Sequence, residues 1–165
     1  MTNEAQSFID RMKNKEKLTY LELSNQELTG SLNLENFTSL SSINAYKNKF
    51  TSLNFLLTLS NKIKLKKLNF WGNQITSLSE ILIILDQFPH LESINLGGNP
   101  LDWNGLSNLT DQQILSLTKA VEGGKVKINS NSSEMALLKH IRQLKEENIL
   151  LKQQIEAQIE TPPKK

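Results

Sequence analysis

Cysteine is absent from this chain of 165 residues, and histidine occurs only at positions 90 and 140. Without thiols the chain forms no disulfide, zinc–thiolate site, iron–sulfur cluster or cysteine nucleophile. The two histidines have no metal-ligand spacing, which disfavours multi-histidine metal sites and histidine-based catalysis. A glycine-rich phosphate loop is also missing, because Gly97 and Gly98 are followed by Asn-Pro. We therefore expect no catalytic residue, no metal and no cofactor.

Long apolar runs and strong charge are missing too. The longest aliphatic run, residues 81–85, is far too short to span a bilayer. The net charge of +2 and the pI near 8.8 are too mild to indicate a nucleic-acid partner. The first ten residues lack the basic and apolar regions of a secretory signal. These features predict a cytoplasmic protein that binds neither membranes nor nucleic acids.

Leucine and asparagine, in contrast, are abundant, with 28 and 18 residues. They recur in an eleven-residue pattern, LxxLxLxxNxL, whose four copies begin at Leu18, Leu40, Leu65 and Leu91. Within each copy, apolar residues alternate with polar ones as in a short strand with one buried face. The predicted inward-facing pairs are Leu21 and Leu23, Ile43 and Ala45, Leu68 and Phe70, and Ile94 and Leu96. Repetition at this spacing predicts stacked coils that share one parallel sheet.

The pattern resembles the leucine-rich repeat family, in its short intracellular type, over about residues 18–109. The resemblance implies an α/β solenoid, with strands on one side and helical or irregular return segments on the other. It also implies recognition of a protein or peptide on the concave, strand-lined face. A polar column follows the strands, where buried amides can satisfy backbone groups of neighbouring coils. Its members are Gln26, Asn48, Asn73 and Asn99.

The segments beside the repeats are predicted to close the ends of the solenoid, which would otherwise expose its core. We assign residues 1–17 to an N-terminal helical cap and residues 110–124 to a C-terminal helical cap. Residues 125–133 are polar and small and are predicted to be a linker that contains a brief strand at 126–128. The last residues, 161–165, are expected to be disordered.

A different period begins in residues 134–160, where apolar residues are spaced alternately by three and four. This spacing is typical of a leucine-zipper coiled coil. Leucine at d and isoleucine at a favour a parallel dimer, in which a single asparagine at a fixes the register. The alternative is one amphipathic helix folded back onto the repeats. The predicted seam consists of Leu137, Ile141, Leu144, Asn148, Leu151 and Ile155.

Side chains that alternate with the buried ones point to the concave face. Tyr46 and Trp71 are predicted neighbours there, because adjacent parallel strands lie about 4.8 Å apart. Two aromatic side chains surrounded by amides form a plausible protein-binding hot spot. The alternative is that they only stabilise the sheet by pairing across it. The candidate partner-binding residues are Tyr46, Trp71, Asn44, Asn69, Asn95, Glu22 and Lys67.

Together these features predict a non-catalytic adaptor that binds a protein or peptide and forms a homodimer through its coiled coil. Two sites in one particle would raise the apparent affinity for a partner. An alternative is a regulatory or targeting subunit of an intracellular enzyme such as a phosphatase. A third interpretation is a structural protein in which only the zipper matters.

Overall fold

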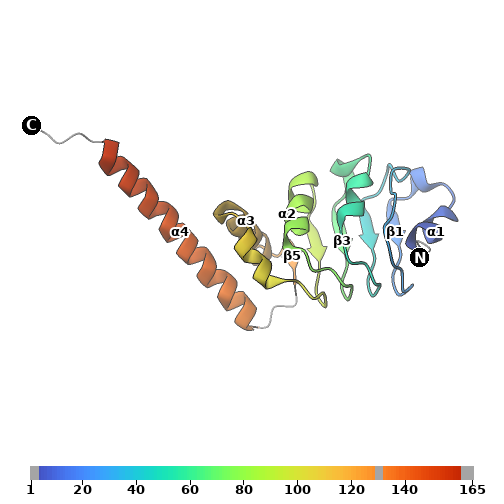
Figure 1. Ribbon diagram of the computed structural model, residues 1–165. Helices are drawn as coiled ribbons and strands as arrows, with labels where there is room; N and C mark the ends of the chain where they lie inside the picture. Colours follow the sequence, from blue (N-terminus) through green and yellow to red (C-terminus); the bar gives the residue numbers. More distant parts are fainter. Residues whose placement is uncertain (1–3, 129–131, 161–165) are drawn as a thin grey trace, which may run out of the picture.

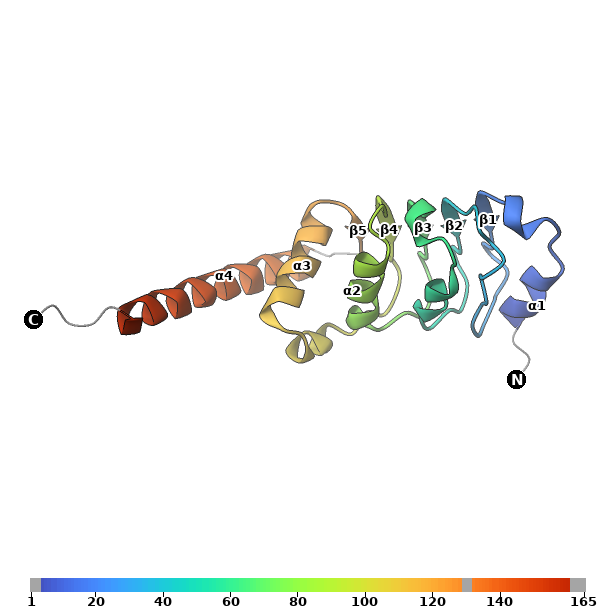
Figure 2. The same ribbon diagram turned by 90° about the horizontal axis from the view of Figure 1, so that it is seen from above.

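The computed structural model describes residues 4–128 and 132–160, with side chains in 4–128 and 138–159. Successive coils place the strands along one side and the helices along the other (Figures 1 and 2). All five strands are parallel and follow one another across the sheet in chain order, which confirms the α/β solenoid. They are β1 (Tyr20–Glu22), β2 (Ser42–Asn44), β3 (Lys67–Asn69), β4 (Ser93–Asn95) and β5 (Val126–Lys127).

The interior of the solenoid is formed by the side chains that alternate with the concave ones. Each strand buries the residue on its inward face, and these residues are Leu21, Ile43, Leu68, Ile94 and Val126. In the first four coils the residue two positions later is buried as well, namely Leu23, Ala45, Phe70 and Leu96. Alternation along an extended chain therefore leaves the opposite face of every strand to solvent.

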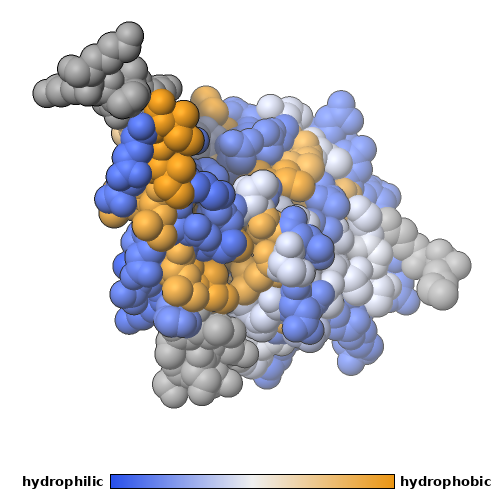
Figure 3. Space-filling model, turned by 60° about the vertical axis from the view of Figure 1, so that its left-hand side comes forward, coloured by the Kyte–Doolittle hydropathy of each residue, from blue (hydrophilic) through white to orange (hydrophobic). Residues whose placement is uncertain are grey.

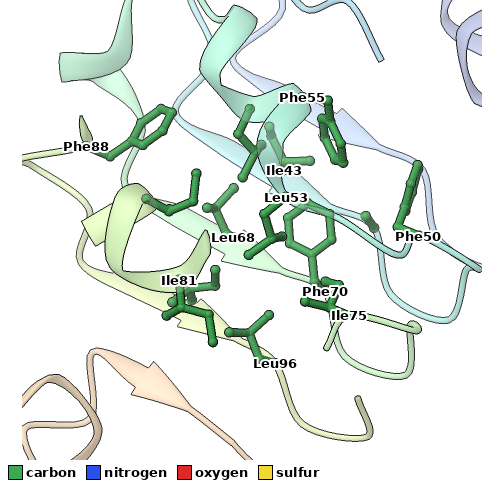
Figure 4. Packing of buried hydrophobic residues seen from close by; sticks show 14 of the residues in the cluster. Ile43, Phe50, Leu53, Phe55, Leu68, Phe70, Ile75, Ile81, Phe88 and Leu96 are labelled. Carbon is green, nitrogen blue, oxygen red and sulfur yellow. The ribbon is translucent and has the colours of Figure 1, made fainter. Parts of the chain in front are cut away.

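The return segments on the other side of the core are mostly short 3₁₀ turns. They are η2 (Asn54–Thr58), η3 (Lys62–Lys64), the helix α2 (Leu78–Gln87) and η4 (Trp103–Asn108). The rings of Phe50, Phe55 and Phe70 pack together with centroids 5.3 to 6.2 Å apart. Figure 4 shows these rings and Ile81 of α2 among the buried side chains between sheet and helices. The core is thus shared between neighbouring coils.

Both ends of this core are covered by helices. At the N-terminal end, α1 (Glu4–Asp10) buries Ala5 and Ile9 completely and is followed by the turn η1 (Lys15–Lys17). At the other end, α3 (Asp111–Glu122) begins with a capping box, in which Thr110 and Gln113 satisfy each other's backbone N–H groups. Its buried residues are Ile114, Leu115, Leu117, Thr118 and Val121.

The segment after α3 differs from a plain linker, because residues 126–127 form β5 at the edge of the sheet. The expected linker residues 129–131 and the expected disordered tail 161–165 lie outside the described residues. The long helix α4 (Ser132–Glu160) starts beside α3 and then projects away from the solenoid (Figures 1 and 2).

Candidate protein interaction surfaces

A column of buried amides holds the coils in register where the chain leaves each strand. Asn73 donates to the carbonyls of Ala45 (2.9 Å) and Phe70 (3.0 Å), and its oxygen accepts from the N–H of Phe50 (3.1 Å). Asn48 and Asn99 make equivalent bonds to backbone groups of their own and the preceding coil. The amide column therefore fixes where each strand ends and how the outward-facing side chains line up.

Gln26 does not act like these asparagines. Its side chain is exposed and donates only to the carbonyl of Ser24 within its own coil, at 3.1 Å. The reason is its position in the first coil, because no preceding strand offers carbonyls on that side. The amide column thus has three members among the described residues, rather than the four expected.

A second column, which the sequence analysis missed, lies immediately before the amides. Asn25, Lys47, Gly72 and Gly98 all adopt left-handed backbone conformations, with φ between 51° and 70°. Glycine adopts this conformation without steric cost, and asparagine does so more readily than other residues. Gly72 and Gly98, at equal positions of two motif copies, are the sequence feature from which this column could have been predicted. Lys47 is the one member whose side chain disfavours the conformation, and its position next to Tyr46 brings its ammonium to the concave face.

Tyr46 and Trp71 stack on each other at the end of strands β2 and β3. Their ring centroids are 5.2 Å apart with an angle of 20° between the planes. The ammonium of Lys47 lies 5.2 Å from the Tyr46 centroid, and a Cβ at position 98 would lie 3.3 Å from Cε2 of Trp71. Both rings are half-buried. The two rings thus cover one face of each other, and the Lys47 ammonium lies beside both, 6.0 Å from the Trp71 centroid.

Beside the aromatic pair, a row of polar side chains crosses the sheet. Glu22 on β1 accepts hydrogen bonds from the Tyr20 hydroxyl (2.5 Å), the Ser24 N–H (2.7 Å) and the Asn44 amide (2.9 Å). Asn69 in turn donates to the oxygen of Asn44 at 3.0 Å. Burial raises the pKa of Glu22, but the hydrogen bonds to its carboxylate outweigh this and lower the pKa from 4.5 to about 2. The hydrogen bond that the Tyr20 hydroxyl donates to this carboxylate in turn raises the pKa of Tyr20.

Helix α4 combines a packed beginning with an exposed remainder. Leu138 is buried against the core and Ile141 packs partly against it. Two ion pairs tie the same part of the helix to α3, Arg142 with Glu122 and Lys145 with Asp111 at 2.7 Å. The hydrogen bond from Lys145 lowers the pKa of Asp111. Residues 138–145 of α4 are therefore fixed to the C-terminal cap.

From Leu144 onward, the predicted seam of α4 is open. Leu144, Leu151 and Ile155 are exposed by 49%, 55% and 55%, and Asn148 is exposed as well. Figure 3 shows hydrophobic residues along the length of this helix. The side chain of Leu137 lies outside those described. Residues 138–145 of α4 thus pack against the C-terminal cap, and the remainder leaves an apolar stripe uncovered; the dimeric coiled coil stays a prediction.

Comparison with known families agrees with this geometry. Residues 63–111 match the family model described as Leucine Rich repeats (2 copies). Residues 63–111 therefore consist of leucine-rich repeats. The matched residues hold the third and fourth copies of the motif. Assignment of the first two copies remains our own and is supported by β1, β2 and the Asn48 amide. A comparison with curated proteins finds no match.

In this leucine-rich repeat protein, the seven candidate partner-binding residues all lie on the outward side of the strands or directly after them. Glu22, Asn44 and Asn69 are engaged with one another, while Lys67 is exposed and forms no ion pair among the described residues. Sequence reasoning missed Lys125 and Lys127, which flank the buried Val126 at the far edge of the same face. The alternation of these lysines with the apolar Val126 is the sequence feature that could have predicted their place on this face.

Two further findings concern membrane-spanning helices and metal-binding groups. Within residues 4–128 and 132–160, no helix is both long and apolar enough to traverse a bilayer. Across the same ranges, histidine, aspartate and glutamate side chains do not gather in groups of three that could bind a metal ion.

Proposed function

We propose that this leucine-rich repeat protein is a non-catalytic cytoplasmic adaptor that binds a protein or peptide on its concave face and dimerises through α4. The stacked pair of Tyr46 and Trp71 carries the first part of the proposal. Aromatic side chains held in place by their neighbours contribute contact area at low entropic cost, which is why they dominate binding hot spots. Here the Lys47 ammonium lies beside both rings, and the backbone of Gly98 lies against Trp71.

The sheet face around this pair is open. The strands lie along one side of the solenoid, and the helices and return segments pack on the opposite side (Figure 2). The backbone hydrogen bonds of the five strands are used within the sheet. A partner therefore binds through side chains on this surface rather than by adding a strand in the middle of it.

The exposed stripe on α4 supports the second part of the proposal. In a parallel pair of helices, Leu144, Leu151 and Ile155 meet their counterparts, and Asn148 faces Asn148 of the second copy. Glu147 then faces Lys152 of the other helix, an attractive pairing of g and e positions. The free stretch is only about two heptads, which is marginal for an isolated coiled coil. Contacts of Leu138, Arg142 and Lys145 with the cap offset this, because the first turns are already formed.

Binding to a partner captured with the wild-type chain tests the concave-face proposal. The double variant Tyr46→Ala and Trp71→Ala should lose the captured partner while it keeps its cooperative unfolding transition. A matched control is Trp103→Ala, which removes an indole from η4, on the side of the solenoid away from the strands. If the double variant retains the partner as well as the control does, the concave face is not the binding surface.

Sedimentation equilibrium of the full chain tests dimerisation. We expect a dimer at tens of micromolar, because the exposed residues Leu144, Leu151 and Ile155 would be buried against a second copy. A monomer across that concentration range would rule out α4 as a dimerisation element.

A further inference from the structure

The concave face carries lysines that lack acidic partners. Lys67 lies on β3, Lys127 lies on β5 opposite Asn95, and Lys125 lies one residue before Val126. Val126 is buried, so the lysines on either side of it point to the concave face. None of the three forms an ion pair with any residue that the structure describes. With Lys47 beside the aromatic pair, four ammonium groups surround this part of the sheet.

Carboxylates are nearly missing from the same surface. Between β2 and β5 the outward-facing residues of the strands are serine, asparagine and lysine. The one acidic residue on a strand is Glu22 at the first edge, and three donors already satisfy its carboxylate. Glu92, just before β4, is paired with Lys66 at 3.1 Å. The positive charge of the concave face is therefore not compensated within the described residues.

We propose that the concave face binds an extended acidic peptide segment, with its carboxylates on Lys67, Lys125 and Lys127 and an apolar side chain against Tyr46 and Trp71. This inference rests on the proposed function and gives the chemistry of the partner. Lys67 and Lys125 are two strands apart, about 10 Å, which an extended peptide covers in about three residues. Unpaired lysines on one partner favour carboxylates on the other, since unlike charges set orientation and exclude wrong partners.

The aromatic geometry favours a peptide over a single-stranded nucleic acid. Bases bind such proteins by stacking on open aromatic faces. The two rings cover one face of each other and the backbone of Gly98 lies against Trp71, so a base cannot stack between the rings. Ring edges are electropositive and suit contact with aliphatic or carboxylate groups. Three or four lysines also supply few of the phosphate contacts on which nucleic-acid affinity depends.

The test uses the full chain and fluorescein-labelled peptides of about ten residues, long enough to cross the sheet at about 3.3 Å per residue. One set is rich in Glu and Asp around a central Phe. Matched sets carry Gln and Asn, or Lys, in place of the acidic residues. Fluorescence anisotropy should show binding of the acidic set, weakening as salt is added, and no binding of the basic set. Equal affinities for the acidic and neutral sets would overturn the proposal, and so would binding of none of the sets.

Charge reversal separates this site from the overall charge of the molecule. Lys67→Glu with Lys127→Glu should weaken binding of the acidic peptides about tenfold or more, since each exposed charge pair contributes modestly. The control Lys13→Glu with Lys17→Glu makes the same charge change near η1, outside the concave face, and should have little effect. Equal losses in the two variants would overturn the proposal.

Two more arms distinguish this inference from the proposed function. Suppose that acidic and neutral peptides bind the wild type equally well and that the variant Tyr46→Ala with Trp71→Ala loses both. The concave face is then a peptide-binding surface, but the proposed preference for acidic peptides is wrong. If that variant binds every acidic peptide as the wild type does, the concave face itself is wrong. A mixed-sequence single-stranded RNA that binds more tightly than the best acidic peptide would overturn the choice of a peptide.

Discussion

The indole of Trp71 lies against the backbone of Gly98, and a Cβ added at position 98 would lie 3.3 Å from its Cε2 atom. The same Cβ would lie 3.2 Å from the backbone of Gly72 in the neighbouring coil. The aromatic pair on the concave face therefore depends on glycine in the turn of the next coil. A substitution at position 98 should therefore affect both the stability of the repeats and the position of Trp71 on the candidate binding surface.

Gly98→Ala should consequently destabilise the protein and displace Trp71. The left-handed φ of +68° costs an alanine about 1–2 kcal/mol, and the close contacts with Gly72 and Trp71 add to that. Gly124→Ala is the matched control, because φ is +73° there but nothing lies within 4 Å of the added Cβ. Urea unfolding followed by tryptophan fluorescence should show the larger loss for position 98. Equal losses would mean that the contact with Trp71 does not constrain position 98.

Asn73→Ala should be far more damaging than Gln26→Ala, although both side chains occupy the same place in the motif. Without Asn73, the carbonyls of Ala45 and Phe70 still accept from the neighbouring Asn48 and Asn99 amides. The N–H of Phe50 loses the acceptor that Asn73 provides. A buried unsatisfied donor costs about 1–3 kcal/mol.

Gln26→Ala removes only an exposed bond to Ser24 and should change the free energy of unfolding by less than about 0.5 kcal/mol. Denaturant titration of both variants measures the difference. Similar losses at positions 26 and 73 would contradict the three-member amide column.

Glu22 should make the protein sensitive to acid. Its pKa in the folded state is about 2, below the ordinary 4.5, so the ionised carboxylate stabilises the folded state. That contribution is fully present above about pH 4.5 and is lost as the pH falls toward 2. Glu22→Gln should flatten the dependence of unfolding midpoint on pH in this window. Tyr20→Phe removes one donor and should flatten it in part. A slope unchanged in Glu22→Gln would show that the carboxylate gains nothing from its three donors.

Leu150 and Leu151 allow a matched test of the helix seam, because their side chains are exposed by 56% and 55%. Only Leu151 falls at a d position, where it would face a second copy. Leu151→Asp should abolish the dimer in sedimentation experiments, since it places a carboxylate in the seam. Leu150→Asp carries the same change on the outer side of the helix and should leave the dimer intact. Loss of dimer in both variants would point to general weakening of the helix rather than to a specific seam.

Much of the solenoid followed from local sequence pattern. Alternation in the four motif copies is enough to predict which residues point inward, and Ile43 and Ala45 are buried as expected. The pairing of Tyr46 with Trp71 followed as well, because equal positions in adjacent coils become neighbours in a parallel sheet. These features depend on short-range periodicity, which a single sequence contains.

Other features depend on contacts between distant residues. The sequence indicated a brief strand at 126–128 but not its partner, and residues 126–127 pair with β4 because the edge of that strand offers unpaired backbone groups. Leu138 lies off the predicted seam and is nevertheless buried against the core. The motif also placed Gln26 with the asparagines, although the first coil has no neighbour for its amide.

The sequence by itself therefore determined the coil repeat, the inward leucines and the stripe on α4, because each of these is a periodicity of burial along the chain. Only the tertiary structure decided that α4 starts on the C-terminal cap, that β5 extends the sheet and that Lys125 and Lys127 join Lys67 on one face. These depend on which backbone edges and apolar surfaces remain uncovered after the coils have stacked, and that is a property of the assembled fold.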